Sequence, residues 1–322
     1  MNAPSPLLSL PGAVAAEAPD EGVAAHYGDL FREQRALDAG EGFVDLSHRG
    51  VVSVTGQDRL SWLHLLLTQH VEALAPGHAT EALVLSAHGH IEHALYLVDD
   101  GETTWAHVEP GTEKDLIAYL ESMKFFYRVD IADRTDDLAV VHLPAGSIAE
   151  APDGATVRET AYGRDLFLPR TELADFAAAA GPPAGVLAYE ALRVAAHRPR
   201  LGLETDHRTI PHEVGWIGTA VHLEKGCYRG QETVARVQNL GRPPRRLVFL
   251  HLDGSEVTLP PHGAAIRLAA EEEGRKLGFV TTSVRHHELG PIALALVKRN
   301  VPADAALLAD ETAAAQETVV EP

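Results

Sequence analysis

The order of apolar and polar positions along the chain predicts interleaved strands and helices. A β-branched run at 51–54 predicts a strand, and the segment after it predicts a helix that Asp58 caps and Pro76-Gly77 ends. The apolar residues of that helix keep helical spacing and should be core: Leu63, Leu66, Leu67, Val71 and Leu74. Further strands are predicted at 82–86, 94–98, 103–108, 125–131 and 138–143. Further helices are predicted at 113–123, 172–180, 186–196 and 231–238, so the pattern as a whole is α+β.

The pattern changes after residue 240. Gly241-Arg242-Pro243-Pro244 ends the helical spacing and predicts a domain boundary. The segment 241–300 then holds short strand-like runs at 247–252, 264–268, 276–282 and 291–297, which predict a small closed or nearly closed β-barrel. The two ends, 1–22 and 301–322, are rich in alanine and acidic residues without periodicity, and we expect both to be disordered.

Composition and charge narrow the class of protein. The 322 residues include 46 acidic and 27 basic ones, a formal net charge of −19, which argues against nucleic acid as the main partner. The chain has one cysteine and therefore no internal disulfide, which fits a reducing compartment. Its first residues have no signal-peptide pattern, and no apolar stretch approaches the ~20 residues of a membrane helix, so we expect a cytoplasmic protein without a membrane partner.

Candidate chemistry is concentrated around the single cysteine, Cys227. The helix expected after Gly230 would place this thiol within about one turn of a helix N-terminus, where unpaired N–H groups favour an anion. Lys225 and Arg229 flank the thiol, and Gly226 and Gly230 would let a partner approach it closely. These residues predict a reactive thiolate, and the alternative is a small buried hydrophobic residue.

A second group combines His88, His90, Glu92 and His93. These residue types bind metals, but alternation in an extended segment places His93 on the opposite face from the other two histidines. We therefore predict no metal site.

Three arginines after the expected boundary form a cationic group: Arg242, Arg245 and Arg246. They fit either contact with a polyanion, such as a polyglutamyl tail or an RNA phosphate, or a solvated linker. No Gly-x-Ser-x-Gly elbow and no glycine-rich phosphate loop is present in the sequence.

The stretch 225–232 reads Lys-Gly-Cys-Tyr-Arg-Gly-Gln-Glu. It matches the Lys-Gly-Cys-Tyr-x-Gly-Gln-Glu signature of the YgfZ-type folate-binding proteins at every specified position, so the chain resembles that family, relatives of the aminomethyltransferase of the glycine cleavage system. The segments 51–58 and 192–206 and the barrel-like end follow in a similar order, so the resemblance covers roughly 22–302.

The resemblance implies a three-part aminomethyltransferase-like architecture, with two interwoven α+β subdomains over 23–240 around a folate-sized cavity, followed by the barrel. It implies tetrahydrofolate or a related reduced folate as ligand. It also implies a role with iron–sulfur proteins or their assembly machinery, which in some relatives is linked to tRNA modification. The implied site has Cys227 as the working thiol, supported by Lys225 and Arg229. The implied folate contacts are Tyr189, Arg193, Gly226, Tyr228, Gly230, Gln231 and Glu232.

The chain departs at two places from the pattern of the aminomethyltransferases that it resembles. His93-Ala94 stands where those enzymes carry an acidic pair, and Ala195-Ala196-His197 stands where related proteins carry Glu-Ala-Gly, whose glutamate would bond the pterin. We therefore expect an accessory factor rather than an active aminomethyltransferase. The alternatives are a folate-dependent one-carbon transferase and a binding module without chemistry.

Overall fold

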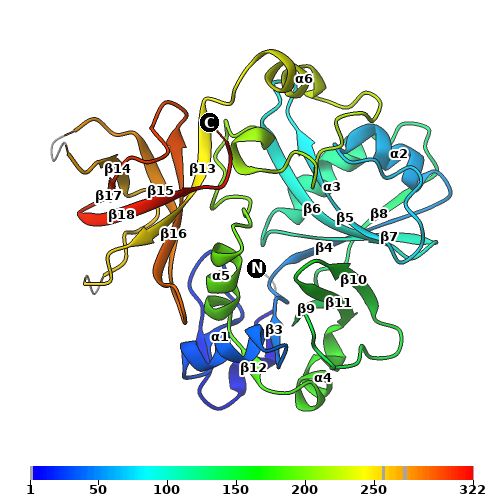
Figure 1. Ribbon diagram of the computed structural model, residues 1–322. Helices are drawn as coiled ribbons and strands as arrows, with labels where there is room; N and C mark the ends of the chain where they lie inside the picture. The colour runs from blue at the N-terminus through cyan, green and yellow to red at the C-terminus, as the bar shows by residue number, and fades with distance from the viewer. Residues whose placement is uncertain (1–2, 256–257, 271–273, 322) are drawn as a thin grey trace. The chain divides into compact units, whose positions relative to one another are not determined.

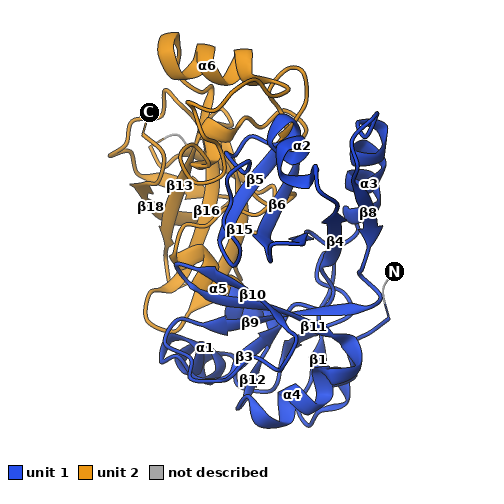
Figure 2. Cartoon of the chain, turned by 90° about the vertical axis from the view of Figure 1, so that its right-hand side faces the viewer, with its two compact units in different colours: residues 1–83, 93–189 blue, residues 84–92, 190–322 orange. Residues whose placement is uncertain are grey.

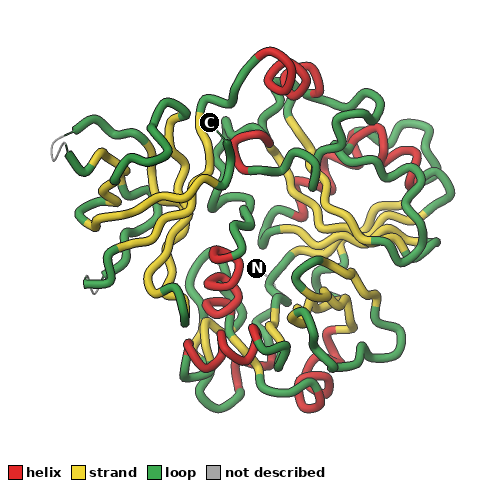
Figure 3. The backbone as a smooth tube through the Cα atoms, in the orientation of Figure 1, coloured by secondary structure: helices red, strands yellow, loops and turns green. Residues whose placement is uncertain are grey.

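The structure is a computed structural model that describes residues 3–255, 258–270 and 274–321 (Figure 1). The chain forms two compact units (Figure 2). Unit 1 holds residues 1–83 and 93–189, and unit 2 holds 84–92 and 190–322. Strands are more extensive than helices in both units, loops connect them, and the helices are short, as Figure 3 shows.

One five-stranded sheet of unit 1 has the order β10-β11-β9-β3-β12. Its strands are β3 (Phe43–Asp45), β9 (Leu138–Pro144), β10 (Thr156–Thr160), β11 (Gly163–Pro169) and β12 (Pro183–Ala184). The core on this sheet is completed by residues of η1 (Pro6–Ser9) and α4 (Leu173–Ala179). The remaining short elements of this unit are β1 (Val14–Ala15), β2 (Ala24–His26), α1 (Leu30–Asp38) and η2 (Arg170–Glu172).

A second sheet has the order β5-β6-β7-β4-β8. Its strands are β4 (Gly50–Thr55), β5 (Ala79–Leu85), β6 (Ile91–Asp99), β7 (Thr103–Val108) and β8 (Asp130–Asp133). Helices α2 (Arg59–Leu66) and α3 (Glu113–Ser122) contact this sheet (Figure 1). The indole of Trp62, which is 1% exposed, donates to the carbonyl of Met123 at 3.0 Å and so joins the two helices.

Unit 2 ends in a closed six-stranded barrel of order β13-β16-β15-β14-β17-β18. The strands are β13 (Arg245–Leu252), β14 (Ala265–Leu268), β15 (Gly278–His286), β16 (Gly290–Lys298), β17 (Leu307–Ala309) and β18 (Thr312–Thr318). Pairing of β13 with β18 closes the barrel around an apolar interior. Before the barrel lie η3 (Pro211–Val214) and α6 (Gln231–Leu240), and α5 (Val186–Ala195) begins in unit 1 and ends in unit 2. The predicted α+β class and C-terminal barrel are confirmed.

The expected disorder of the two ends is wrong for the described residues. Near the start, Leu7 is 2% exposed in the core of unit 1, and the hydroxyl of Ser5 donates to the carboxylate of Asp45. At the other end, β17 and β18 belong to the barrel, which therefore continues well past residue 300. The helices and strands in both segments are too short to produce a periodic sequence pattern, and long-range contacts order them.

Two internal predictions are also wrong in their extent. The helix after Asp58 ends at Leu66, well before Pro76, and Asp58 makes no cap hydrogen bond because its carboxylate binds Arg128. The strand expected at 125–131 is present only as β8, since the amide of Tyr127 closes a turn to Lys124. Among the described residues, no helix has the length and apolarity needed to cross a membrane.

Substitution of two adjacent leucines tests whether the C-terminal segment is an ordered part of the barrel. Leu307 is fully buried in the barrel, whereas Leu308 is only half-buried. We expect Leu307→Ala to lower the free energy of unfolding by about 2–5 kcal/mol and Leu308→Ala to lower it far less, because only the first leaves a cavity. Urea denaturation measures both. Equal, negligible effects would mean that the tail does not belong to the barrel.

Candidate functional site

The stretch around Cys227 forms an exposed loop in unit 2 that leads into α6. Cys227 lies on the surface, and a Cβ at Gly226 would meet no atom within 4 Å. Nothing in the fold therefore crowds Gly226, and the thiol is open to an approaching molecule.

Two glycines set this loop on the β5–β6 turn. Gly230, the residue before α6, has a φ of +84°, and a Cβ there would lie 2.6 Å from the carbonyl oxygen of Ser86. On the other side, a Cβ at Gly89 would lie 2.8 Å from the Cβ of Thr233. The backbone before α6 and the backbone of the β5–β6 turn therefore approach each other without side chains between them. This close approach requires glycine at both Gly89 and Gly230.

Lys225 is buried beneath the loop. The residue is 4% exposed, and its ammonium lies 5.1 Å from the ring centroid of Tyr228, itself 7% exposed. Burial lowers the pKa of Lys225 to about 8, although attraction to the negative charge of the Cys227 thiolate opposes the shift. The ammonium and the sulfur thus interact electrostatically. The reactive thiolate expected from the sequence stays a prediction.

Arg229 has a different partner from the one expected. Its guanidinium forms an ion pair with Glu92 at 2.9 Å, and both side chains are more than one third exposed. Such a pair contributes about 0.2–1 kcal/mol at most, so it orients the loop rather than supplying a strong local field. Lys225 is the flanking cation whose own pKa is affected by Cys227.

The N-terminus of α6 is also used differently from the prediction. The helix starts at Gln231, four positions after Cys227, and the amides of Gln231, Thr233 and Val234 donate to backbone carbonyls. These amides are satisfied within the backbone, so they are not directed at the thiol. The side chain of Gln231 donates to the carbonyl of Lys225 at 3.4 Å, and Glu232 is exposed.

Arg193 lies in a buried hydrogen-bond network. Its guanidinium donates to Glu190 at 2.8 and 3.0 Å, to Glu204 at 2.9 Å and to Thr282 at 3.1 Å, and it is 3% exposed. These bonds occupy the donor groups that a folate carboxylate would need, and so the network holds α5 to strand β15. These contacts give Arg193 a structural role, and the folate contact that the resemblance implies for it stays a prediction.

The arginines at the boundary are structural as well. Arg245 binds Asp206 at 2.6 Å and Glu213 at 2.8 Å, and Arg246 is fully buried. For these two residues, neither the polyanion contact nor the solvated linker is correct.

Unit 1 holds a buried polar cluster that the sequence did not predict. Asp165 on β11 accepts hydrogen bonds from His142 at 2.8 Å, Arg158 at 2.8 Å and His107 at 3.1 Å. Burial alone would raise the pKa of Asp165, but the two imidazoles and the guanidinium hold that pKa well below its usual range. For His107, burial outweighs the attraction of Asp165 and lowers the pKa to about 4, so this imidazole is neutral at pH 7.

Two tyrosines pack on these imidazoles. The ring of Tyr96 stacks on His107 with centroids 4.8 Å apart and an interplanar angle of 17°. Tyr189 meets His142 edge to face at 5.1 Å. The cluster joins β7, β9 and β11, and its one sequence signal was a charged residue, Asp165, directly before the apolar run 166–168. The name Asp165 cluster is used below for six residues: Tyr96, His107, His142, Arg158, Asp165 and Tyr189.

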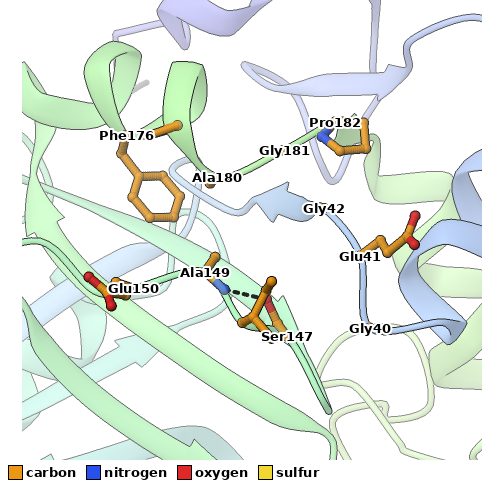
Figure 4. A pocket seen from close by; sticks show the side chains of 12 residues that line it. Gly40, Glu41, Gly42, Ser147, Ala149, Glu150, Phe176, Ala180, Gly181 and Pro182 are labelled. Carbon is orange, nitrogen blue, oxygen red and sulfur yellow. Dashed lines mark hydrogen bonds between the residues drawn. The ribbon is translucent and has the colours of Figure 1, made fainter.

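A separate cavity of about 530 Å³ also lies in unit 1 (Figure 4). Phe176 and Pro182 line it together with the glycines at 40 and 42, and Ser147 accepts a hydrogen bond there from the amide of Ala149 at 3.3 Å. None of the residues predicted for the site lines this cavity, and it lacks a charged side chain that is buried. We do not assign the function to it.

Comparison with known proteins identifies the family. The sequence model of the GCVT N-terminal domain matches residues 22–150. The aminomethyltransferase of Geobacillus kaustophilus is 30% identical over 315 residues, which cover 86% of this chain and 84% of that protein. The aminomethyltransferase of Bacillus subtilis is 27% identical over 312 residues, covering 84% and 83% of the two chains.

A solved structure supports the same fold. The glycine cleavage system aminomethyltransferase T from Bartonella henselae superimposes with a TM-score of 0.80 at 18% identity, covering 98% of this chain and 95% of that one. At this identity the likeness establishes the fold alone. The fold and the similarity along most of both sequences agree, and the chain belongs to the aminomethyltransferase family.

Proposed function

We propose that this protein binds tetrahydrofolate or a related reduced folate and uses Cys227 to support the assembly or maintenance of iron–sulfur proteins. Membership of the aminomethyltransferase family supports the folate ligand, as does the resemblance of 225–232 to the YgfZ-type folate-binding signature. The cytoplasm is the compartment that the single cysteine favours. The link to tRNA modification would then pass through iron–sulfur enzymes, because a net charge of −19 disfavours direct binding to RNA.

One observation carries the proposal: an exposed thiol coupled to a buried ammonium. Thiolates are the form of cysteine that binds iron and attacks disulfides. The charge of Lys225 attracts the thiolate of Cys227, while the open space at Gly226 leaves the sulfur accessible to a cluster or a partner thiol. A purely structural cysteine would be buried and needs no such neighbour.

Within the buried Asp165 cluster, the half-buried Tyr189 is our candidate for contact with the folate ring. The ring of Tyr189 is held edge to face by His142, and flat heteroaromatic rings stack on such side chains. The hydrogen-bonded carboxylate of Asp165 fixes both imidazoles and hence both tyrosines. We therefore place the pterin end of the ligand against Tyr189.

The second candidate is a folate-dependent aminomethyltransferase, the activity that the relatives' names carry. Ala94 is 3% exposed and has no titratable group, and His93 is half-buried. General acid–base help typically contributes a factor of about 10²–10⁴ in rate. A chain without the acidic pair would lose this factor, unless His93 supplied it.

The folate surface can be tested by replacing Tyr189. We expect Tyr189→Ala to weaken tetrahydrofolate binding roughly tenfold and Tyr189→Phe to retain most of the affinity, because a stacking surface contributes about 0.5–1.5 kcal/mol beyond its buried area. Isothermal titration calorimetry measures both. Tyr162→Ala is the control, since Tyr162 is 43% exposed in the turn between β10 and β11. The placement is wrong if Tyr189→Ala and the control bind folate equally well.

The coupling of Cys227 to Lys225 predicts a pH dependence. Lys225 is protonated below its pKa of about 8 and neutral above it. Lys225→Met should therefore slow alkylation of Cys227 by iodoacetamide at pH 7 by roughly fivefold, the effect of about 1 kcal/mol of charge–charge attraction. At pH 9.5 the two proteins should react at the same rate, because the wild-type lysine has also lost its charge. Arg229→Gln is the matched control and should have little effect, because that guanidinium is paired with Glu92. A rate ratio that stays constant with pH would exclude the electrostatic explanation.

The function itself is tested in cells that lack the chromosomal copy. Cys227→Ser should fold normally and retain folate affinity, but should fail to restore the activity of iron–sulfur enzymes. Gly226→Ala separates partner access from folding, because the fold has room for the methyl group and a partner would meet it. We expect this variant to be stable and partly defective.

Two results would contradict the proposed function. Full restoration by Cys227→Ser would refute the role of the thiol. Turnover of an aminomethyl-lipoyl substrate by the purified protein at about 1–10³ per second would establish the transferase instead.

A further inference from the structure

We propose that His64, His70 and Glu72 of unit 1 bind one divalent transition-metal ion of the zinc class. One donor atom from each side chain lies within 4.8 Å of the other two. No other group of three such side chains among the described residues meets this condition. The proposed function uses none of these residues, so the metal site stands independently of it.

The three side chains come from residues just before and just after the C-terminus of α2. His64 lies in the last turn of α2, and His70 and Glu72 follow in the segment after the helix. The rings of His64 and His70 are 4.7 Å apart at an interplanar angle of 76°. His70 and Glu72 are exposed and His64 is half-buried, so the group faces solvent.

The segment after α2 is held firmly to the sheet. Thr68 is fully buried, its amide donates to the carbonyl of Leu83 at 3.0 Å, and its hydroxyl accepts from the amide of Leu83 at 2.8 Å. Val71, between His70 and Glu72, is 1% exposed. Buried residues thus fix the backbone on which the exposed donors stand, and a fixed backbone lowers the entropy cost of binding.

The donor set indicates the class of ion. Imidazole and carboxylate together suit zinc and its neighbours, whereas calcium and magnesium prefer oxygen donors alone. Zinc bonds of about 2.0–2.2 Å place tetrahedral ligand atoms about 3.4 Å apart, so small side-chain rotations would close the present separations. The carbonyl end of α2 also favours a cation. Three protein ligands leave a fourth position for water or a substrate atom.

The sequence pattern directed attention to His88, His90 and His93, which are closer together in the chain. The rings of His88 and His90 lie 6.1 Å apart, and Glu92 is paired with Arg229. The histidines that do converge are separated by a helix end, which no spacing rule for a single strand or helix describes.

Calorimetry with zinc chloride tests the site on the full chain. Cys227→Ser serves as the background protein, so that the thiol does not contribute. We expect one equivalent of zinc to bind with a Kd of roughly 10 µM or tighter, in the range of −7 kcal/mol or better. His70→Ala and Glu72→Gln should each weaken binding at least tenfold, and both change exposed side chains that the core does not need.

The matched control is His88→Ala, which removes an equally exposed histidine from outside the group. It should leave the affinity unchanged. Cobalt substitution gives a second readout, because a four-coordinate site produces intense visible absorption that His70→Ala should abolish. The proposal is overturned if zinc does not saturate, or if His70→Ala and His88→Ala bind it equally, since the 18 histidines would then hold the ion non-specifically.

Discussion

The packing of unit 2 depends on the hydrogen bonds made by the buried carboxylate of Glu204. The residue is fully buried and accepts hydrogen bonds from Arg193, from the amide of Arg200 and from the hydroxyls of Thr281 and Thr282. A charge placed out of water is tolerated only when its lone pairs are satisfied, and loss of one partner leaves the rest uncompensated. Because the two threonines belong to β15 and Arg193 belongs to α5, this network ties the barrel to the end of α5.

Unit 1 follows the same rule with Asp165. Here the compensating groups are two imidazoles and one guanidinium, and the same contacts fix the orientation of the aromatic rings above them. A carboxylate with a strongly lowered pKa and a neutral His107 do not exchange protons near pH 7. The cluster is therefore a rigid, preorganised support for the rings of Tyr96 and Tyr189 and not a proton-transfer site.

Local patterns predicted what depends on neighbours in sequence. Alternation located β7 and β9 nearly to the residue, and the boundary at 241–244 marked the start of the barrel. The motif at 225–232 also drew attention to a loop that the structure shows to be exposed and coupled to a buried lysine. What failed depends on distant partners. Arg229 finds Glu92, 137 positions away, and the three residues of β17 are a strand only because β14 and β18 pair with them.

Because Cys227 is the single cysteine of the chain, any disulfide that it forms involves a second molecule. A chain with one cysteine has no second thiol to resolve an oxidised Cys227, so a disulfide there must join two molecules. The other molecule is a small thiol, a partner protein or another copy of this chain. The exposed sulfur leaves room for such an encounter. Thiol–disulfide exchange at Cys227 is therefore bimolecular: its thiolate attacks the disulfide of a second molecule and releases a thiol from it, at a rate set by the concentration of that molecule.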